Sequence, residues 1–350
     1  MKKVFVSSTG AQSGQSLAAW CIAEIYNSRG FRIGFFKPFI TRPILQNGQV
    51  IDKDALLMKR YFNLTEELNI LSPIISEGIP GDEVVREEQL SRIEQCYEMV
   101  KKDKDVLIIM GAEKIFYDPE SPYLPDGILV NKFDAPVVLV DRFQNESMSM
   151  YSILAIDSFL KDKVKIVFLN QIPLEDMETV YNKLIPFFQK RGTPLLFLIP
   201  KDRILSSLTV KDIVDLIQGE VLTGESRLKN LVESTSISST HLKGSLYLFR
   251  QIYNKIILLG LETEDLNSPL LSPKVTGIIL TGGRRPAPVI VNTCGDVGVP
   301  LVISPFDTFV TMEKIQKQQV HIKENDVYKL KRFIQLLGGE TAIQKIINEI

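Results

Sequence analysis

Residues 7–16 read Ser-Ser-Thr-Gly-Ala-Gln-Ser-Gly-Gln-Ser and join a short apolar run, Val4-Phe5-Val6, to the segment 17–26. The apolar run has the composition of a buried strand, and the segment after the turn has that of a helix. A small-residue turn between a strand and a helix gathers backbone N–H groups and the helix N-terminus around one point, where an anion can bind. The sequence therefore predicts a phosphate-binding loop at residues 7–16.

One position departs from the full phosphate-loop pattern. That pattern ends in Gly-Lys-Ser/Thr, whereas this chain has Gln15 between Gly14 and Ser16. A unit charge at ~4 Å in an effective dielectric of ~20 contributes about 4 kcal/mol. Its loss from a phosphoryl-transfer transition state costs about three decades in rate. We therefore expect negligible ATP hydrolysis, unless another cation such as Lys37 or Arg42 reaches the phosphates.

Composition is that of an ordinary globular chain, long enough for two domains. The 350 residues are 45% hydrophobic and 24% charged, with a net charge of -1. The balanced charge argues against a nucleic-acid partner. The N-terminal apolar run is too short for a signal peptide or a membrane span, so we expect no membrane partner. Three cysteines and two histidines lack the spacing of a metal site and fit a reducing, cytoplasmic setting.

Strands and helices alternate through the first 200 residues. After the first strand and helix, apolar strands are expected at 31–36, 105–110, 136–141, 164–170 and 194–200, and helices at 52–61, 83–102, 147–160 and 174–189. Residues 39–50 read as a loop. This alternation predicts an α/β fold with a doubly wound parallel sheet. Ligands bind at the carboxyl ends of such strands, where the sequence places Gly14, Lys37, Met110, Asp141 and Asn170.

The pattern changes to shorter strands from residue 219 onward. Strands are expected at 220–222, 231–238, 245–249, 254–260, 277–280 and 300–304, and closing helices at 324–337 and 341–350. We expect a P-loop domain at 1–210, a smaller α/β domain at 211–325 and C-terminal helices at 326–350. The apolar faces of these helices, with Phe333, Leu336 and Ile343, predict a homo-oligomer formed through the second half of the chain.

The first half resembles the dethiobiotin synthetase family of P-loop proteins. It is still more similar to the version found at the N-terminus of long bacterial phosphotransacetylases. The resemblance covers roughly residues 2–210 and rests on motifs in family order: the loop at 8–16, Phe36-Lys37-Pro38, the helix start at Asp52 and Asp54, Leu169-Asn170, and residues 199–203. The family enzymes use ATP and Mg²⁺, so the resemblance implies a P-loop NTPase-like fold and a nucleotide as cofactor.

The resemblance also implies roles for single residues. The cofactor-binding set would be Gly10, Gly14, Gln15, Ser16, Lys37 and Asn170, with Asn170 on the base, and the metal ligands would be Ser16 and Asp54. Plain alternatives stay open. The glycines could only shape the turn, Lys37 could be a surface lysine, and Asp54 could be a first-turn acid. Asn170 could cap the next helix. The family's acidic residue at the end of the third strand is Met110 here.

The second half resembles the DRTGG domain over roughly residues 212–320. The matching pieces are Leu222-Thr223-Gly224, residues 280–283, residues 298–301 and Asp307-Thr308-Phe309. The Asp-Arg pair that names the domain is absent, because residues 259–265 read Leu-Gly-Leu-Glu-Thr-Glu-Asp. We find no acetyltransferase module in the 350 residues and do not expect phosphate acetyltransferase activity.

Three functions remain in competition. The first is a non-catalytic or weakly catalytic regulatory protein that binds ATP, another nucleotide or a small metabolite, and a partner protein. The second is an ATP-dependent enzyme of the dethiobiotin or cobyrinate type, and the third is a scaffold that binds no small molecule. Convergence of Ser16, Lys37 and Asp54 near the loop would count against the scaffold.

Overall fold

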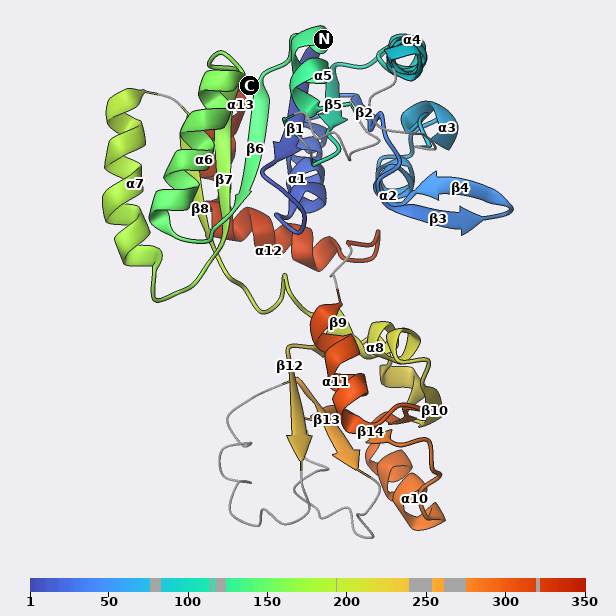
Figure 1. Ribbon diagram of the computed structural model, residues 1–350. Helices are drawn as coiled ribbons and strands as arrows, with labels where there is room; N and C mark the ends of the chain where they lie inside the picture. Colours follow the sequence, from blue (N-terminus) through green and yellow to red (C-terminus); the bar gives the residue numbers. More distant parts are fainter. Residues whose placement is uncertain are drawn as a thin grey trace. The chain divides into compact units, whose positions relative to one another are not determined.

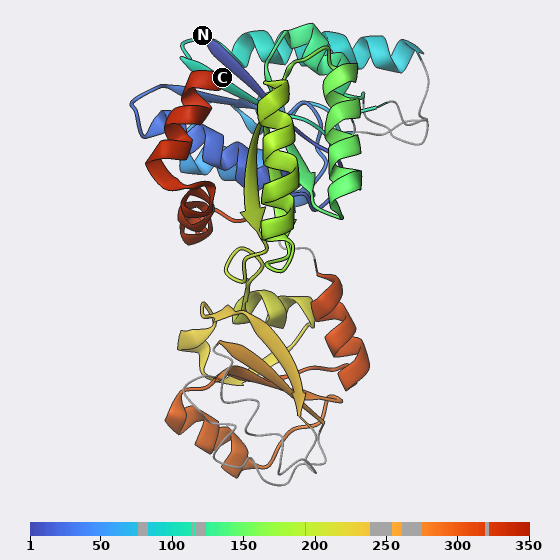
Figure 2. The same cartoon turned by 90° about the vertical axis from the view of Figure 1, so that its left-hand side faces the viewer.

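The structure is a computed structural model that describes residues 1–75, 83–113, 115–116, 124–192, 194–238, 254–260, 275–318 and 322–350. Its contacts divide the chain into two compact units (Figures 1 and 2). The first unit combines Met1–Lys201 with Ile322–Ile350, and the second is Asp202–His321. No helix in the described part of the chain has the length and apolarity that crossing a membrane requires.

The first unit is built on a parallel sheet of six strands, which confirms the predicted fold class. The strand order is β2-β5-β1-β6-β7-β8, and every neighbouring pair is parallel. The strands are β1 (Lys2–Ser8), β2 (Ile33–Phe36), β5 (Val106–Met110), β6 (Val137–Arg142), β7 (Val164–Ile172) and β8 (Leu195–Pro200). Helices cover both faces of the sheet, which is why the strands read as continuous apolar runs in the sequence.

The direction of each crossover assigns the helices to the two faces. The chain moves one way along the sheet from β1 to β2 and the other way in its later crossovers, so α1 lies on the opposite face from α4–α7. These helices are α1 (Gln15–Asn27), α4 (Glu83–Val100), α5 (Asp126–Phe133), α6 (Glu146–Phe159) and α7 (Met177–Arg191). The smaller helices α2 (Lys53–Tyr61) and α3 (Leu68–Leu71) follow β2. The short helix α5 has no counterpart among the sequence predictions.

An antiparallel hairpin occupies residues 43–52, so the loop expected at 39–50 was wrong in this part. It consists of β3 (Pro43–Gln46) and β4 (Gln49–Asp52). Asn47 and Gly48 at its tip have φ values of 51° and 78°, as a two-residue type I′ turn requires. An Asn-Gly pair favours such hairpins, so the sequence does carry a signal for this turn. The hairpin places Pro43 opposite Asp52, so the residue after Arg42 lies beside the start of α2.

The two C-terminal helices belong to the first unit instead of following the second as a separate segment. They are α12 (Val327–Leu337) and α13 (Gly339–Glu349), and they pack on the same side of the unit as α1. Phe333 is fully buried, with its ring 5.8 Å from that of Phe168 on β7. Leu336 and Ile343 are half-buried. The apolar faces that predicted a homo-oligomer are therefore largely covered within the chain.

The second unit has a sheet of five strands in the order β10-β15-β14-β13-β12, with β10 antiparallel at the edge. The elements are β10 (Glu220–Thr223), β12 (Ser234–Ser238), β13 (Lys255–Gly260), β14 (Val275–Thr281), β15 (Leu301–Ile303), α8 (Val210–Leu216), α10 (Pro288–Val297) and α11 (Thr308–Lys317). Shorter pieces are β9 (Leu208–Thr209), β11 (Leu231–Val232) and the 3-10 turn Glu225–Arg227. The expected strand at 245–249 and residues 261–265 lie outside the described residues.

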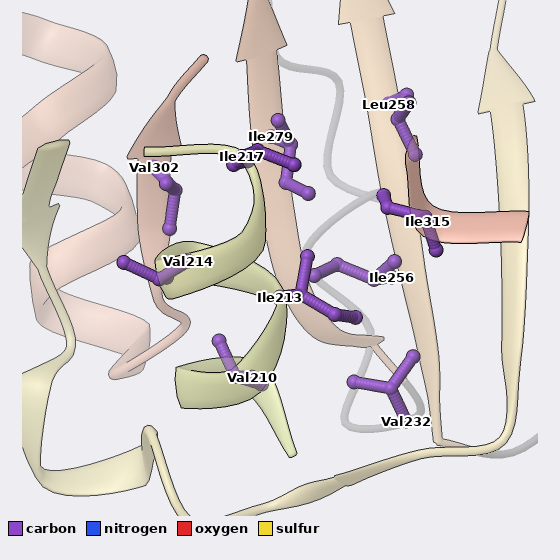
Figure 3. Packing of buried hydrophobic residues seen from close by; sticks show 10 residues of the cluster. All are labelled: Val210, Ile213, Val214, Ile217, Val232, Ile256, Leu258, Ile279, Val302 and Ile315. Carbon is purple, nitrogen blue, oxygen red and sulfur yellow. The ribbon is translucent and has the colours of Figure 1, made fainter. Parts of the chain in front are cut away.

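Alternate residues of the interior strand β13 pack into two cores on opposite faces of the sheet. Ile256 and Leu258 pack with α8 and α11 in the cluster of Figure 3, whereas Ile257 and Leu259 pack with α10 on the opposite face. This alternation follows from the two-residue period of a strand. The second unit is therefore a three-layer domain, and its α/β class agrees with the sequence prediction.

We predict that Phe333→Ala destabilises the first unit by about 3–5 kcal/mol, because a large buried ring is lost and leaves a cavity. Urea unfolding followed by circular dichroism measures the change. Phe309→Ala is the matched control, since Phe309 is 74% exposed, and it should shift stability by about 0.5 kcal/mol or less. Equal shifts in the two variants would contradict the docking of α12.

Candidate phosphate-loop site

The loop at residues 7–16 joins β1 to α1 and has two residues with positive φ, a conformation that favours glycine. Gln12 and Gly14 have φ values of 61° and 100°. A Cβ atom on Gly14 would lie 2.5 Å from Nδ2 of Asn170, whereas one on Gly10 would meet open space. Glycine is therefore required at position 14 for its backbone and its close contact, and it is not required at position 10.

Two side chains near the end of β7 donate hydrogen bonds to backbone carbonyls of the loop. Nδ2 of Asn170 donates to the Ser13 carbonyl at 2.8 Å, and Nε2 of Gln171 donates to the Gln12 carbonyl at 2.8 Å. Oδ1 of Asn170 accepts from its neighbour's backbone N–H and caps no helix. Thr9 is held in turn by the buried carboxylate of Asp141, at 2.6 Å. Asn170 thus positions the loop, and its contact with a nucleotide base stays a prediction.

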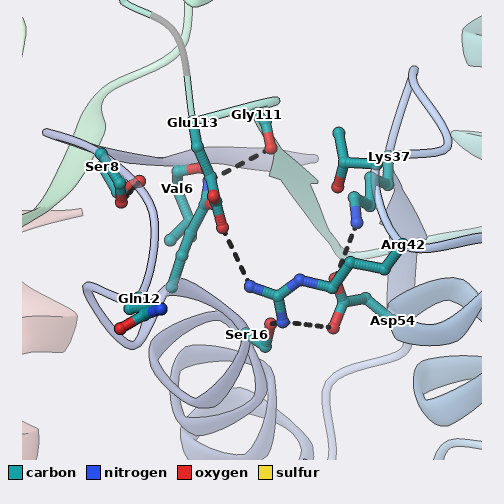
Figure 4. A network of polar contacts seen from close by, with 12 residues as sticks. Val6, Ser8, Gln12, Ser16, Lys37, Arg42, Asp54, Gly111 and Glu113 are labelled. Atoms are coloured by element: carbon teal, nitrogen blue, oxygen red, sulfur yellow. Dashed lines mark hydrogen bonds and ion pairs between the residues drawn. The ribbon is translucent and has the colours of Figure 1, made fainter. Parts of the chain in front are cut away.

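Gln15, in the lysine's position, turns its side chain into the sheet. Its Nε2 donates to the carbonyl oxygens of Val6 at 2.9 Å and Gly111 at 3.2 Å, at the ends of β1 and β5 (Figure 4). The residue is fully buried, and its Oε1 has no partner among the described residues. Flipping the amide would put its oxygen against two carbonyls, so this orientation is the favourable one. The side chain therefore bridges two strands and adds no charge to the loop.

Lys37 is a buried ion-pair partner, so the alternative of a surface lysine was wrong. Its side chain is 1% exposed, and Nζ lies 2.9 and 3.0 Å from the two oxygens of Asp52 and 2.7 Å from Oδ2 of Asp54. Burial lowers the pKa of Lys37, but the charges of Asp54 and Asp52 outweigh it and raise that pKa overall. Asp52 also caps α2, accepting from the N–H groups of Asp54 and Ala55, which accounts for the helix start that the sequence places here.

Arg42 links this ion-pair cluster to the loop. Its Nη1 donates to Oγ of Ser16 at 2.6 Å and lies 3.6 Å from Oδ1 of Asp54, and its Nη2 donates to Oε1 of Glu113 at 2.9 Å (Figure 4). Burial raises the pKa of Asp54, but the cations Lys37 and Arg42 outweigh it and lower that pKa to about 2. Ser16, Lys37 and Asp54 thus come together, and Arg42 connects them.

The Mg²⁺ ions that the resemblance implies do not fit the arrangement of these side chains. Mg²⁺ requires an octahedral set of oxygen ligands. Both oxygens of Asp54 face cations, and Oγ of Ser16 accepts from Arg42. Met110, where the family has an acid, is buried and offers no oxygen ligand. Among the residues that the structure describes, no group of three or more His, Cys, Asp or Glu side chains could hold a metal.

The sequence predictions missed Glu113 and Asp126. Asp126, the first residue of α5, is fully buried beside the end of β5, where Oδ2 accepts from Ser7 at 2.5 Å and Oδ1 accepts from the Ala112 N–H at 2.8 Å. A Cβ on Gly111 would lie 2.0 Å from Oδ2, so this carboxyl explains the glycine. Burial raises the pKa of Asp126 to about 7. A carboxyl group thus lies beside Gly111, one residue past the position where Met110 replaces the family's acid.

We predict that Gly14→Ala destabilises the loop by roughly 1–3 kcal/mol, through backbone strain and displacement of Asn170. Gly10→Ala is the control and should change stability by about 0.5 kcal/mol or less, because its Cβ meets open space. Urea unfolding of both variants measures the difference. Equal costs at the two positions would rule out this geometry.

We predict that Asp126→Asn stabilises the protein at pH 8 and not at pH 4. An unfolded carboxyl ionises near pH 4, whereas folded Asp126 keeps its proton up to about pH 7, so the folded state binds more protons between these values. The wild type therefore loses stability as pH rises through this window, by up to about 4 kcal/mol. Urea unfolding at both pH values tests this, with exposed Asp103→Asn as the control. A gain independent of pH would refute it.

Comparison with known proteins identifies both halves. The family model described as an AAA domain matches residues 2–209, and the DRTGG domain model matches residues 212–318. A phosphate acetyltransferase from Synechocystis is 22% identical over 99% of this chain and 51% of its own length. The ATP-dependent dethiobiotin synthetase from Methanocaldococcus jannaschii is 22% identical over 57% of this chain and 94% of its own length.

The likeness to solved structures is weak. The CBS and DRTGG domains of a Clostridium perfringens pyrophosphatase, complexed with the activator diadenosine tetraphosphate, are 15% identical over 49% of this chain and 86% of that chain, with a TM-score of 0.27. A likeness this low does not show a shared ligand. The chain spans about half the length of the curated phosphate acetyltransferases that it matches. By its longest match, the chain belongs to the AAA domain family, in the dethiobiotin synthetase-like form that is followed by a DRTGG domain.

Proposed function

We propose that this chain is a regulatory module of the phosphotransacetylase N-terminal type, which binds a nucleotide or a small metabolite and does not turn over ATP at an enzymatic rate. The observation that carries the proposal is that both cations near the loop are already paired with carboxylates. Lys37 is paired with Asp52 and Asp54, and Arg42 with Asp54 and Glu113. Two cations thus face three carboxylates, with a neutral Gln15 between β1 and β5. Transfer of a phosphoryl group needs positive charge that neutralises its transition state.

Binding a phosphate group requires less positive charge than transferring a phosphoryl group does. The loop retains the backbone of an anion site, with Gly14 and the N-terminus of α1 in place. Asn170 and Gln171 bind backbone carbonyls of the loop, so the loop's N–H groups are held in position before a ligand arrives. Such a site can hold a phosphate through hydrogen bonds while adding little catalytic power. This difference supports a sensor more than an enzyme.

The relatives support a role beside a catalytic domain. The match to phosphate acetyltransferases takes in nearly all of this chain and only half of theirs. A regulatory module needs a target, so we expect a protein partner, and a homo-oligomer stays a prediction. The three cysteines are buried and unpaired, which supports the cytoplasmic setting proposed from the sequence.

An ATP-dependent enzyme of the dethiobiotin type is the second candidate. It is favoured by the convergence of Ser16, Lys37 and Asp54 at one site. The same convergence counts against a scaffold without a ligand. For phosphoryl transfer, the charge of Lys37 or Arg42 would have to be freed from its carboxylates, because a cation that is already neutralised adds little to the transition state, and breaking buried ion pairs is unfavourable.

Differential scanning fluorimetry against a panel of nucleotides tests the proposal. A ligand that binds only the folded state raises the melting temperature with its concentration. We expect at least one nucleotide to do so, and we expect ATP turnover far below about 1 per second, the low end of ordinary enzymes. Turnover at or above that rate would establish the second candidate. A panel with no stabilising nucleotide or metabolite would leave the scaffold.

We predict that Gln15→Lys tightens nucleotide binding more than it raises turnover. The lysine restores one charge at the loop, but Met110 still lacks the acid that the family enzymes have there. Adding Met110→Glu should then raise turnover by more than the sum of the single changes. Isothermal titration and a phosphate-release assay measure the two effects, with Gln15→Met as the uncharged control. If Gln15→Lys alone raised turnover and left nucleotide affinity unchanged, the prediction would be wrong.

A further inference from the structure

We propose that Arg42 is the resident cation of the phosphate-loop site and occupies the place of a divalent metal, so that the site accepts a phosphate-bearing ligand without Mg²⁺. The statement about the ligand rests on the function proposed above, whereas the statement about the metal does not. Its basis is the set of oxygen atoms around the guanidinium group. Ser16, Asp54 and Glu113 come from three separate segments and surround this one cation, at 2.6, 3.6 and 2.9 Å.

The backbone of Arg42 is fixed by the same carboxylate that holds Lys37. Oδ2 of Asp52 accepts from the backbone N–H groups of Thr41 and Arg42, both at 3.1 Å, and the Lys53 N–H donates to the Arg42 carbonyl at 3.1 Å. Pro43 then begins the hairpin strand β3. Only 21% of the Arg42 side chain is exposed. Its position is therefore built into the fold, unlike that of a mobile surface arginine.

The backbone of Glu113, one of the two carboxylate residues around Arg42, has an uncommon conformation. Its φ of 64° lies in the left-handed region, which is unfavourable for a residue with a Cβ atom. The segment after β5 adopts this conformation while the Glu113 carboxylate, 18% exposed, pairs with Arg42. The Glu113 carboxylate therefore belongs to the groups that hold the Arg42 side chain in place.

The charges around the site oppose a divalent ion while Arg42 is docked. The groups that face one another are Lys37, Arg42, Asp52, Asp54 and Glu113, and each carboxylate already pairs with a cation. A metal could bind Ser16 and Asp54 only by displacing the guanidinium group from its partners. Two of the five N–H donors of Arg42 are used in the hydrogen bonds to Ser16 and Glu113. The planar arrangement of these donors suits phosphate oxygens.

The first experiment uses Mn²⁺ alone, measured by electron paramagnetic resonance. We expect no saturable Mn²⁺ binding to the wild type. Arg42→Ala should gain a site, because it frees oxygen ligands on Ser16, Asp54 and Glu113. Arg42→Gln keeps most of the side-chain volume, should fold like the wild type and should also gain the site. Arg142→Ala is the control, since it removes an exposed positive charge beside the same loop, where Arg142 donates to Gln12 at 3.3 Å.

The second experiment measures ADP binding by isothermal titration, with Mg²⁺ or with EDTA. The affinity of the wild type should differ by about twofold or less between the two conditions, whereas that of Arg42→Gln should fall about tenfold or more in EDTA. Mn²⁺ binding to the wild type, or the same Mg²⁺ dependence in both proteins, would overturn the proposal. If ADP and the other nucleotides of the panel bind neither protein under any condition, the nucleotide function and the ligand part of this proposal fail, and the Mn²⁺ result alone decides the role of Arg42 toward metal.

Discussion

The buried ammonium group of Lys37, held between Asp52 and Asp54, is the interaction on which the arrangement of the site depends. Asp52 accepts from Lys37, caps α2 and binds the backbone N–H groups that precede the hairpin. One carboxylate therefore sets the end of β2, the start of α2 and the base of the hairpin at once. Removing Lys37 would leave two buried carboxylates near each other without their cation, which is strongly destabilising. The Asp52 carboxylate also holds the backbone N–H of Arg42, whose side chain extends from there to Ser16 in the loop.

The neutral residue at position 15 and the cation at position 42 are physically compatible. Arg42 binds the hydroxyl group of Ser16, the residue directly after Gln15. A lysine at position 15 would bring a second positive charge close to this guanidinium group unless a ligand or a carboxylate compensated it. Gln15 avoids that conflict and uses its amide to join β1 to β5. The missing lysine and the docked arginine are thus best understood as one arrangement of charge.

The sequence predicted the strands of the first sheet well, because strands of a covered parallel sheet are continuous apolar runs. Short elements were harder. The hairpin at 43–52 depends on two residues at its tip, and α5 is eight residues long and begins after a proline. The site was predicted where local motifs name it, as for Ser16, Lys37 and Asp54. Glu113 and Asp126 escaped because their partners, Arg42 and Ser7, lie 71 and 119 positions away in the chain. Only the folded topology brings such pairs together.

The same limit explains the C-terminal helices. Their apolar spacing predicts that they pack, but it does not say on what, and the preceding 120 residues belong to another unit. The chain leaves the first unit after β8, forms the second unit, and returns with α12 against β8 and Phe333 against Phe168. The first unit therefore cannot complete its core until the second has been synthesised. Contacts between residues so distant in sequence require closure of a long loop, which slows folding when the loop is disordered. A compact folded domain spans far less distance than a disordered chain of the same length, so early folding of the inserted unit would lower the entropic cost of completing the unit that carries the phosphate loop.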